Sequence, residues 1–146
     1  MSSPQHEWEP QLLQTKLLVP RVHPELVARP RLAARLDEGC DCKLTLISAP
    51  AGFGKTTLLS RWIAAGDREP AVAWVSLDAR DNDPTRFWSY VIAALQTVFP
   101  EVGRTPSAML HSPQPPPIEA ILTELINDLA VEPETCRLIL DDYQSI

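Results

Sequence analysis

Residues 49–57 read Ala49-Pro50-Ala51-Gly52-Phe53-Gly54-Lys55-Thr56-Thr57. The apolar run Leu44-Thr45-Leu46-Ile47 comes just before them, and the helix-compatible run Leu58-Leu59-Ser60-Arg61-Trp62-Ile63-Ala64-Ala65 follows. This order predicts a strand, a tight glycine loop and a helix, which is the context that a phosphate-binding P-loop requires. Gly54, Lys55 and Thr56 match the pattern G-x-x-x-x-G-K-S/T, and Ala49 replaces its first glycine. We therefore predict a P-loop at residues 49–57.

The residue types of this loop suit a nucleoside triphosphate bound together with Mg²⁺. Glycines let backbone N–H groups approach phosphates, and the N-terminus of the following helix adds further N–H groups and a positive dipole. Lys55 is expected to reach the β- and γ-phosphates, and Thr57 to contact the α-phosphate. The Thr56 hydroxyl is the expected Mg²⁺ ligand. The predicted binding site for ATP or ADP is the whole loop: Ala49, Pro50, Ala51, Gly52, Phe53, Gly54, Lys55, Thr56 and Thr57.

A second part of such a site is predicted near the other end of the chain. Arg137-Leu138-Ile139-Leu140-Asp141-Asp142 reads as an apolar strand that ends in two carboxylates. Buried strands of this type suit a parallel sheet, and ligands of open α/β sheets bind at the carboxyl ends of strands. Asp141 is the predicted Mg²⁺ ligand, and Asp142 is the predicted catalytic group that polarises an attacking water. Taken alone, the segment could also be an ordinary strand before a solvated turn, but the P-loop favours the functional interpretation.

Composition and charge exclude several classes of protein. The chain has 146 residues, which is enough for one domain with a real core. Its net charge is −6 and it has no cluster of Lys and Arg, so no nucleic-acid surface is expected. No apolar run reaches membrane-spanning length and no signal peptide is evident, so we expect a cytoplasmic protein without a membrane partner. The three cysteines are expected to be free thiols.

Residues 1–14 are expected to be a flexible tail, and residues 15–146 the N-terminal part of a P-loop NTPase domain. Residues 15–20 read as extended, Pro30 as the start of a helix that Gly39 ends, and residues 71–77 as a buried strand. Asp83-Pro84 predicts the start of a helix whose core-facing residues are Phe87, Trp88, Val91, Ile92 and Leu95. Residues 100–117 are poor in order signals and end in a proline-rich loop. The next helix has an apolar face of Ile118, Ile121, Leu122, Leu125, Ile126 and Leu129.

Residues 15–146 resemble the N-terminal nucleotide-binding domain of the MalT-like regulators, which are LuxR-type transcriptional activators of the STAND class of P-loop ATPases. Five segments carry the resemblance: 15–20 (TKLLVP), 27–32 (VARPRL), 48–57 around the P-loop, 74–90 (WVSLD, DNDP, Phe87 and Tyr90) and 140–143 (LDDY, a Walker B motif). The resemblance implies ATP-site roles for the P-loop and Asp141. It places Val19, Pro20 and Arg29 near the adenine or ribose.

The same resemblance implies a three-layer α/β P-loop fold with a parallel sheet. In related ATPases a strand that follows the Walker B strand lies between it and the P-loop strand, so the sheet is expected to be incomplete in a chain that ends just after Walker B. The family also implies self-association, slow ATP hydrolysis, and DNA binding through a C-terminal helix-turn-helix that this chain lacks. Two alternatives remain open: an ordinary P-loop kinase or ATPase, and a truncated remnant without function.

Overall fold

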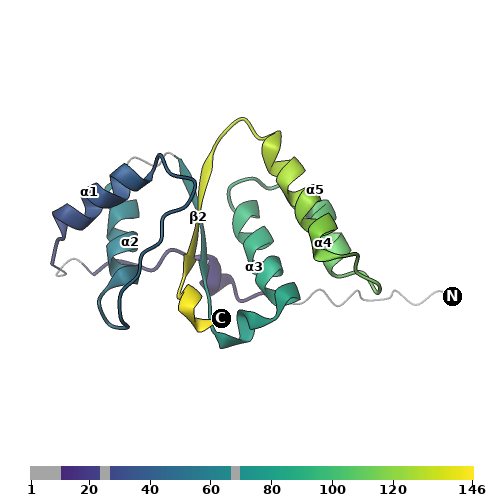
Figure 1. Cartoon of the computed structure of the whole chain (residues 1–146), viewed down its shortest axis with the longest axis horizontal. Coiled ribbons are helices and arrows are strands. Elements are labelled where there is room, and N and C mark those ends of the chain that lie inside the picture. The colour runs from purple at the N-terminus through teal and green to yellow at the C-terminus, as the bar shows by residue number, and fades with distance from the viewer. Residues whose placement is uncertain (1–10, 24–26, 67–69) are drawn as a thin grey trace.

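The computed structural model describes residues 11–23, 27–66 and 70–146 of the chain (Figure 1). Three short 3-10 helices, five α-helices and two strands are formed in these residues. In chain order they are η1 (Gln14–Leu17), α1 (Pro30–Gly39), α2 (Lys55–Ala65), β1 (Ala71–Ser76), η2 (Ala79–Asn82), α3 (Pro84–Gln96), α4 (Arg104–Leu110), α5 (Ile118–Ala130), β2 (Cys136–Asp141) and η3 (Tyr143–Ser145).

The two strands form a parallel sheet with helices on both of its faces. The register runs from Ala71 opposite Cys136 to Ser76 opposite Asp141, so both strands end at the same edge. Just beyond the strands the Leu77 N–H donates to the Asp141 carbonyl at 3.0 Å. Helices α1 and α2 lie on one side of the sheet, and α3, α4 and α5 lie on the other (Figure 1). The expected α/β class and parallel pairing are therefore confirmed, and Asp141 is placed at the carboxyl edge of the sheet.

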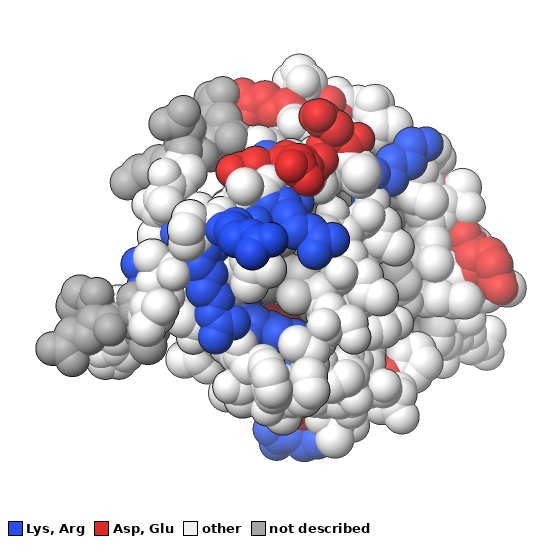
Figure 2. Space-filling view, turned by 60° about the vertical axis from the view of Figure 1, so that its left-hand side comes forward, with Lys and Arg blue, Asp and Glu red and all other residues white. Residues whose placement is uncertain are grey.

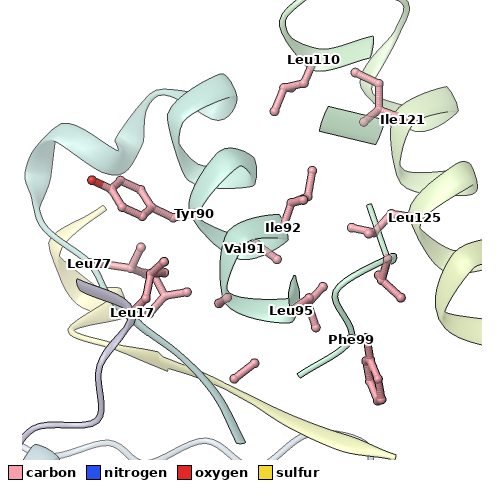
Figure 3. Packing of buried hydrophobic residues seen from close by; sticks show 14 residues of the cluster. Leu17, Leu77, Tyr90, Val91, Ile92, Leu95, Phe99, Leu110, Ile121 and Leu125 are labelled. Carbon is pink, nitrogen blue, oxygen red and sulfur yellow. The ribbon is translucent and has the colours of Figure 1, made fainter. Parts of the chain in front are cut away.

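The hydrophobic core lies between the sheet and the helices α3, α4 and α5 (Figure 3). Helix α3 begins as expected, because the Asp83 side chain accepts a hydrogen bond from the Arg86 N–H at 2.8 Å and Pro84 takes the first helical position. The buried apolar cluster consists of Leu17, Ala73, Val75, Leu77, Tyr90, Val91, Ile92, Ala94, Leu95, Phe99, Val102, Leu110, Ile121 and Leu125.

A group of buried charges ties the segment around η1 to the start of α3. The Lys16 ammonium contacts the Asp81 carboxylate and lies 3.0 Å from Asp78 Oδ2. Arg86 Nε donates to Asp81 Oδ1 at 2.8 Å, and the Lys16 ammonium lies 4.7 Å from the centre of the Tyr90 ring. Burial raises the pKa of Asp81, but hydrogen bonds from Lys16, Asp78 and Arg86 outweigh that effect and leave the pKa below its usual value. The charged form of this fully buried carboxyl is thus stabilised.

The expected strand at residues 44–47 is wrong. The segment has no regular secondary structure, and Leu44 and Leu46 are 85% and 81% exposed. A strand requires a neighbour for its N–H and C=O groups, and in the described part of the chain the sheet contains only β1 and β2. The apolar pattern shows that the segment is suited to a strand, but it cannot show whether a partner is available.

Three smaller expectations also differ from the structure. Residues 104–110 form α4 where a loop was expected; Gly103, with a φ of 76°, precedes it, and Pro106 lies in its first turn, where no helical N–H bond is lost. Residues 14–17 form the 3-10 helix η1 instead of an extended segment, and Ile126 of α5 is 64% exposed. Of the expected tail, residues 1–10 lie outside the described residues, and the Leu13 N–H donates to Tyr90 Oη at 3.1 Å.

Candidate functional site

The glycine loop leads directly into the N-terminus of α2. Gly52 and Gly54 have φ values of 82° and 77°, in the left-handed region that favours glycine. Gly54 is the N-cap of α2, and its carbonyl accepts the Leu58 N–H at 2.9 Å. A Cβ at Gly52 would have no atom within 4 Å, so the backbone conformation rather than crowding calls for glycine there. The two glycines therefore place backbone groups without a Cβ at the positive end of a helix.

Two cations border the loop. Lys55 Nζ donates to the carbonyls of Ala49 at 2.7 Å and Pro50 at 3.3 Å, so its side chain folds back over the loop. Arg29 Nη1 donates to the Phe53 carbonyl at 2.9 Å from the residue before α1. Both ammonium and guanidinium groups bind phosphate oxygens well, and here both are held by carbonyl oxygens that a phosphate could replace.

Thr56 and Asp141, which are 85 residues apart in the sequence, meet at the carboxyl edge of the sheet. The Thr56 hydroxyl lies 2.9 Å from Oδ1 and 2.8 Å from Oδ2 of Asp141. Asp141 is buried, and burial raises its pKa above the usual value, although the hydrogen bond from Thr56 opposes the shift. A bound cation would offset the cost of ionising this buried carboxyl, because a nearby positive charge favours the ionised form.

These oxygen groups fit Mg²⁺ better than a metal that needs several protein ligands. No group of three or more His, Cys, Asp or Glu suited to a metal occurs in the described residues. Mg²⁺ is bound by few protein oxygens and takes its remaining ligands from water and phosphates. The hydroxyl of Thr56 and the carboxylate of Asp141, next to the glycine loop at the N-terminus of α2, have the chemistry of such a pair.

The other predicted site residues lie less centrally. Asp142 has a φ of 57°, is exposed, and accepts a hydrogen bond from Gln144 Nε2 at 3.0 Å. Its negative charge contributes to the raised pKa of Asp141. Val19 is half-buried and is not among the residues that line the cavity described next.

A cavity of about 580 Å³ extends from the loop along the groove between α1 and α2. The lining residues of α1 occur at positions i, i+3 and i+7, and those of α2 at positions i, i+3, i+4 and i+7, so each helix lines the cavity with one face. The lining residues include Val27, Ala28, Arg29, Pro30, Ala33 and Asp37 on the α1 side, and Gly52, Gly54, Thr57, Leu58, Arg61, Trp62, Ala65 and Gly66 on the α2 side.

Sequence reasoning found only the loop end of this cavity. Arg29, Gly52, Gly54 and Thr57 were predicted site residues, whereas Asp37 and Trp62 were not. At the far end Trp62 Nε1 donates to Asp37 Oδ1 at 2.7 Å, and the Arg137 guanidinium lies 4.9 Å from the centre of the Trp62 ring. The sequence spacing could have identified Asp37 and Trp62 as lining residues only if the packing of α1 on α2 had been known.

The fold and the site together describe an α/β chain with a glycine-rich loop at a helix N-terminus and a buried carboxylate at the edge of a parallel sheet. No protein-family model matches the chain. Over 135 residues, or 92% of the chain, it is 39% identical to the HTH-type transcriptional regulator MalT of Cronobacter sakazakii. It is 38% identical over the same length to MalT of two strains of Klebsiella pneumoniae. The sequence is therefore that of a MalT-like segment.

The chain spans about 15% of the length of these curated relatives. In the described residues, no helix combines the length and the apolar character needed to cross a membrane.

Proposed function

We propose that this chain is an ATP- and Mg²⁺-binding switch module of a LuxR-type, MalT-like transcriptional regulator of the STAND class. The observation that carries the proposal is the contact between Thr56 and Asp141 at 2.8–2.9 Å. This contact joins the start of α2, next to the glycine loop, to the acidic end of β2, and a Mg²⁺ ion held by both would require that arrangement. The likeness to MalT supports a regulator.

In this proposal each part of the site has one task. Backbone N–H groups of the loop and of the first turn of α2 bind the phosphates, together with Lys55 and Thr57. The site can hold the nucleotide either as the triphosphate, ATP, or as its hydrolysis product, ADP. Thr56 and Asp141 hold Mg²⁺, and their direct hydrogen bond must then give way to bonds with the metal. The position of α2 against β2 thus depends on the ligand, which is the physical basis for a switch.

The wider role is proposed from the likeness to the regulators. Self-association, a cytoplasmic location, and DNA contact through a helix-turn-helix outside this chain belong to that role. Slow ATP hydrolysis would use Asp142 to polarise a water. A kinase or an ordinary ATPase is less well supported, because the curated relatives are transcriptional regulators.

The test is a titration of labelled ATP, with and without Mg²⁺, into the wild-type chain, Lys55→Ala and Asp141→Asn. Lys55→Ala is expected to lower the affinity at least tenfold in both conditions, since it removes a charge-assisted contact worth about 1.5–3 kcal/mol. Asp141→Asn is expected to retain Mg²⁺-free binding and to lose the gain that Mg²⁺ provides. Arg104→Ala on α4, which removes a 67% exposed cation, is the matched control. Equal affinities of wild type and Lys55→Ala would contradict the proposal.

A further inference from the structure

The cavity between α1 and α2 is lined by Arg29 at its loop end, by Arg61 in its wall and by the carboxylate of Asp37 at its far end. Arg29 stands at the glycine loop, and Asp37 stands at the far end, seven residues along α1 from Pro30. Helix α1 carries Arg31 in its first turn and Asp37 and Glu38 in its last turn, which is the reverse of the order that favours a helix dipole. On the face that carries α1 and α2, basic side chains gather directly beside acidic ones (Figure 2). This order of charges is not explained by helix stability.

A nucleotide is complementary to this arrangement of charges. Its phosphates are anionic, and a base such as adenine presents a neutral amino group that donates hydrogen bonds. Thr57 lines the cavity at the loop end, and Trp62 lies five residues further along α2, about 7.5 Å away along the helix axis. The groove therefore continues from the phosphate loop to an aromatic side chain and a carboxylate, as a base-binding pocket requires.

Asp37 is exposed, and its carboxylate is held by a hydrogen bond to one of its two oxygens. Oδ1 accepts the Trp62 indole N–H at 2.7 Å, whereas Oδ2 has no hydrogen-bond partner among the described residues. The Trp62 ring is held as well, since its indole N–H is bonded to Asp37 and Arg137 lies over the ring. A fixed carboxylate oxygen and a fixed aromatic surface in one cavity are suited to recognising a planar ring with an amino group.

We propose that the far end of this cavity selects a purine that bears an exocyclic amino group, with Asp37 Oδ2 accepting from that amino group and Trp62 contacting the ring. The inference rests on the proposed nucleotide function and adds the residues that determine base specificity. Neither residue belongs to the glycine loop or to the acidic strand end. Their substitution should therefore alter the choice of base and leave the binding of phosphates intact.

The experiment measures the affinities of ATP, inosine triphosphate and inorganic tripolyphosphate, each with Mg²⁺, for the full chain. Inosine carries a carbonyl oxygen where adenine carries the amino group, and tripolyphosphate carries no base. The wild type is expected to bind ATP about tenfold more tightly than inosine triphosphate, because one charge-assisted hydrogen bond is lost and a carbonyl faces a carboxylate.

Asp37→Asn is the decisive variant. Its side-chain oxygen can still accept from Trp62, and its amide N–H groups then take the place of Oδ2, so a donor faces the base. The preference for ATP should disappear or reverse in favour of inosine triphosphate, while the affinity for tripolyphosphate stays within twofold of the wild type. Glu38→Gln removes the same charge from the neighbouring position outside the cavity lining and should keep the wild-type preference.

Trp62→Ala tests the aromatic surface separately. It should weaken both nucleotides about tenfold, ATP more than inosine triphosphate because Asp37 also loses its hydrogen bond to Trp62, and leave tripolyphosphate binding unchanged, since one stacked aromatic contact is worth about 1–3 kcal/mol. Unchanged tripolyphosphate binding in each variant shows that the loop is intact. An equal preference for ATP in the wild type and Asp37→Asn would overturn this inference alone. Absence of binding of all three ligands by the wild type would overturn the proposed function with it.

Discussion

Helices α2 and α3 are of similar length, with 11 and 13 residues, yet they are packed very differently. Of α3, six residues are buried: Ser89, Tyr90, Val91, Ile92, Ala94 and Leu95. Of α2, only Ser60 is buried, and the large apolar side chains Leu58, Leu59, Trp62 and Ile63 are half-buried. The helix at the candidate site is thus the one with the thinner apolar cover.

The difference divides the molecule into two halves. One half, with α3, α4 and α5, contains most of the hydrophobic core, and the other half, with α1 and α2, contains the candidate site. Burial of apolar surface contributes about 25 cal/mol per Å², and most of it lies between the sheet and the helices α3 to α5. Segments with few buried contacts open at lower free energy than the core does. A ligand that binds the α2 half can therefore stabilise it by mass action, and that response is what a switch needs.

The largest expected contrast is between two aliphatic side chains. Ile92 on α3 is 2% exposed, so Ile92→Ala should lower the free energy of unfolding by about 3–4 kcal/mol. Leu46, 81% exposed before the loop, should lose at most about 0.5 kcal/mol when changed to Ala. Urea unfolding followed by circular dichroism measures both. A cost for Leu46→Ala close to that for Ile92→Ala would show that residues 44–47 are covered in solution.

Two glycines with similar backbone conformations provide the next contrast. A Cβ at Gly103 would lie 2.7 Å from Ile92 Cγ2, whereas one at Gly52 would have no atom within 4 Å. Gly103→Ala should cost about 3 kcal/mol, from the left-handed conformation and from overpacking together. Gly52→Ala should cost only the backbone strain, about 1 kcal/mol. Thermal unfolding of the two variants decides the matter, and equal costs would contradict the difference in packing.

Local signals predicted the elements of both halves well. Pro30 and Gly39 bound α1, Asp83 caps α3, and the strands β1 and β2 lie within one residue of their expected positions. These signals succeed because caps, prolines and apolar patterns act within a few residues. The strand expected at residues 44–47 failed because pairing depends on distant residues, and α4 was missed because the surrounding prolines resemble a loop.

The site was predicted only where a motif exists. The loop and Asp141 follow from residue types and spacing, and their meeting follows from the parallel arrangement of α/β folds. Asp37 and Trp62 belong to no motif, and their hydrogen bond depends on how α1 packs against α2. Helix packing of this kind is a tertiary property that one helix pattern cannot specify.

The two halves should also respond oppositely to acid. Hydrogen bonds from Arg80 and Lys16 lower the pKa of Asp78, and the pKa of Asp81 is lowered as well. The ionised carboxylates of these two residues therefore stabilise the folded chain above the usual Asp pKa of 3.8, and this stabilisation is lost as the pH falls below that value. The pKa of Asp141 is raised by burial, so its charged form costs stability at neutral pH, and this cost is relieved as the pH falls through the raised pKa.

Lys16→Met tests the charge cluster of the α3 half. It should cost about 2 kcal/mol at pH 7, since Asp81 keeps Arg86 as a partner but loses its closest cation. The free energy of unfolding should also depend less on pH below about 4, because the pKa values of Asp78 and Asp81 are lowered less without Lys16. Unfolding measured from pH 3 to pH 7 gives both quantities, and an unchanged acid dependence would show that Lys16 does not set these pKa values.

The smallest expected effect has opposite signs in the two halves. Ser60 on α2 and Ser89 on α3 are both buried, but among the described residues Ser60 Oγ has no hydrogen-bond partner, whereas Ser89 Oγ donates to the Thr85 carbonyl at 2.7 Å and lies 3.1 Å from His111 Nε2. Ser60→Ala removes an unpaired buried hydroxyl and introduces the best helix former, so it should stabilise the chain by about 0.5 kcal/mol.

Ser89→Ala breaks existing hydrogen bonds and should destabilise the chain by about 1 kcal/mol. The midpoints of urea unfolding for the two variants, measured side by side at pH 7, give the signs directly. Because both substitutions remove one oxygen from a buried position on a helix, differences in helix propensity cancel between them. A loss of stability in Ser60→Ala equal to that in Ser89→Ala would show that the buried Ser60 hydroxyl has a hydrogen-bond partner in solution.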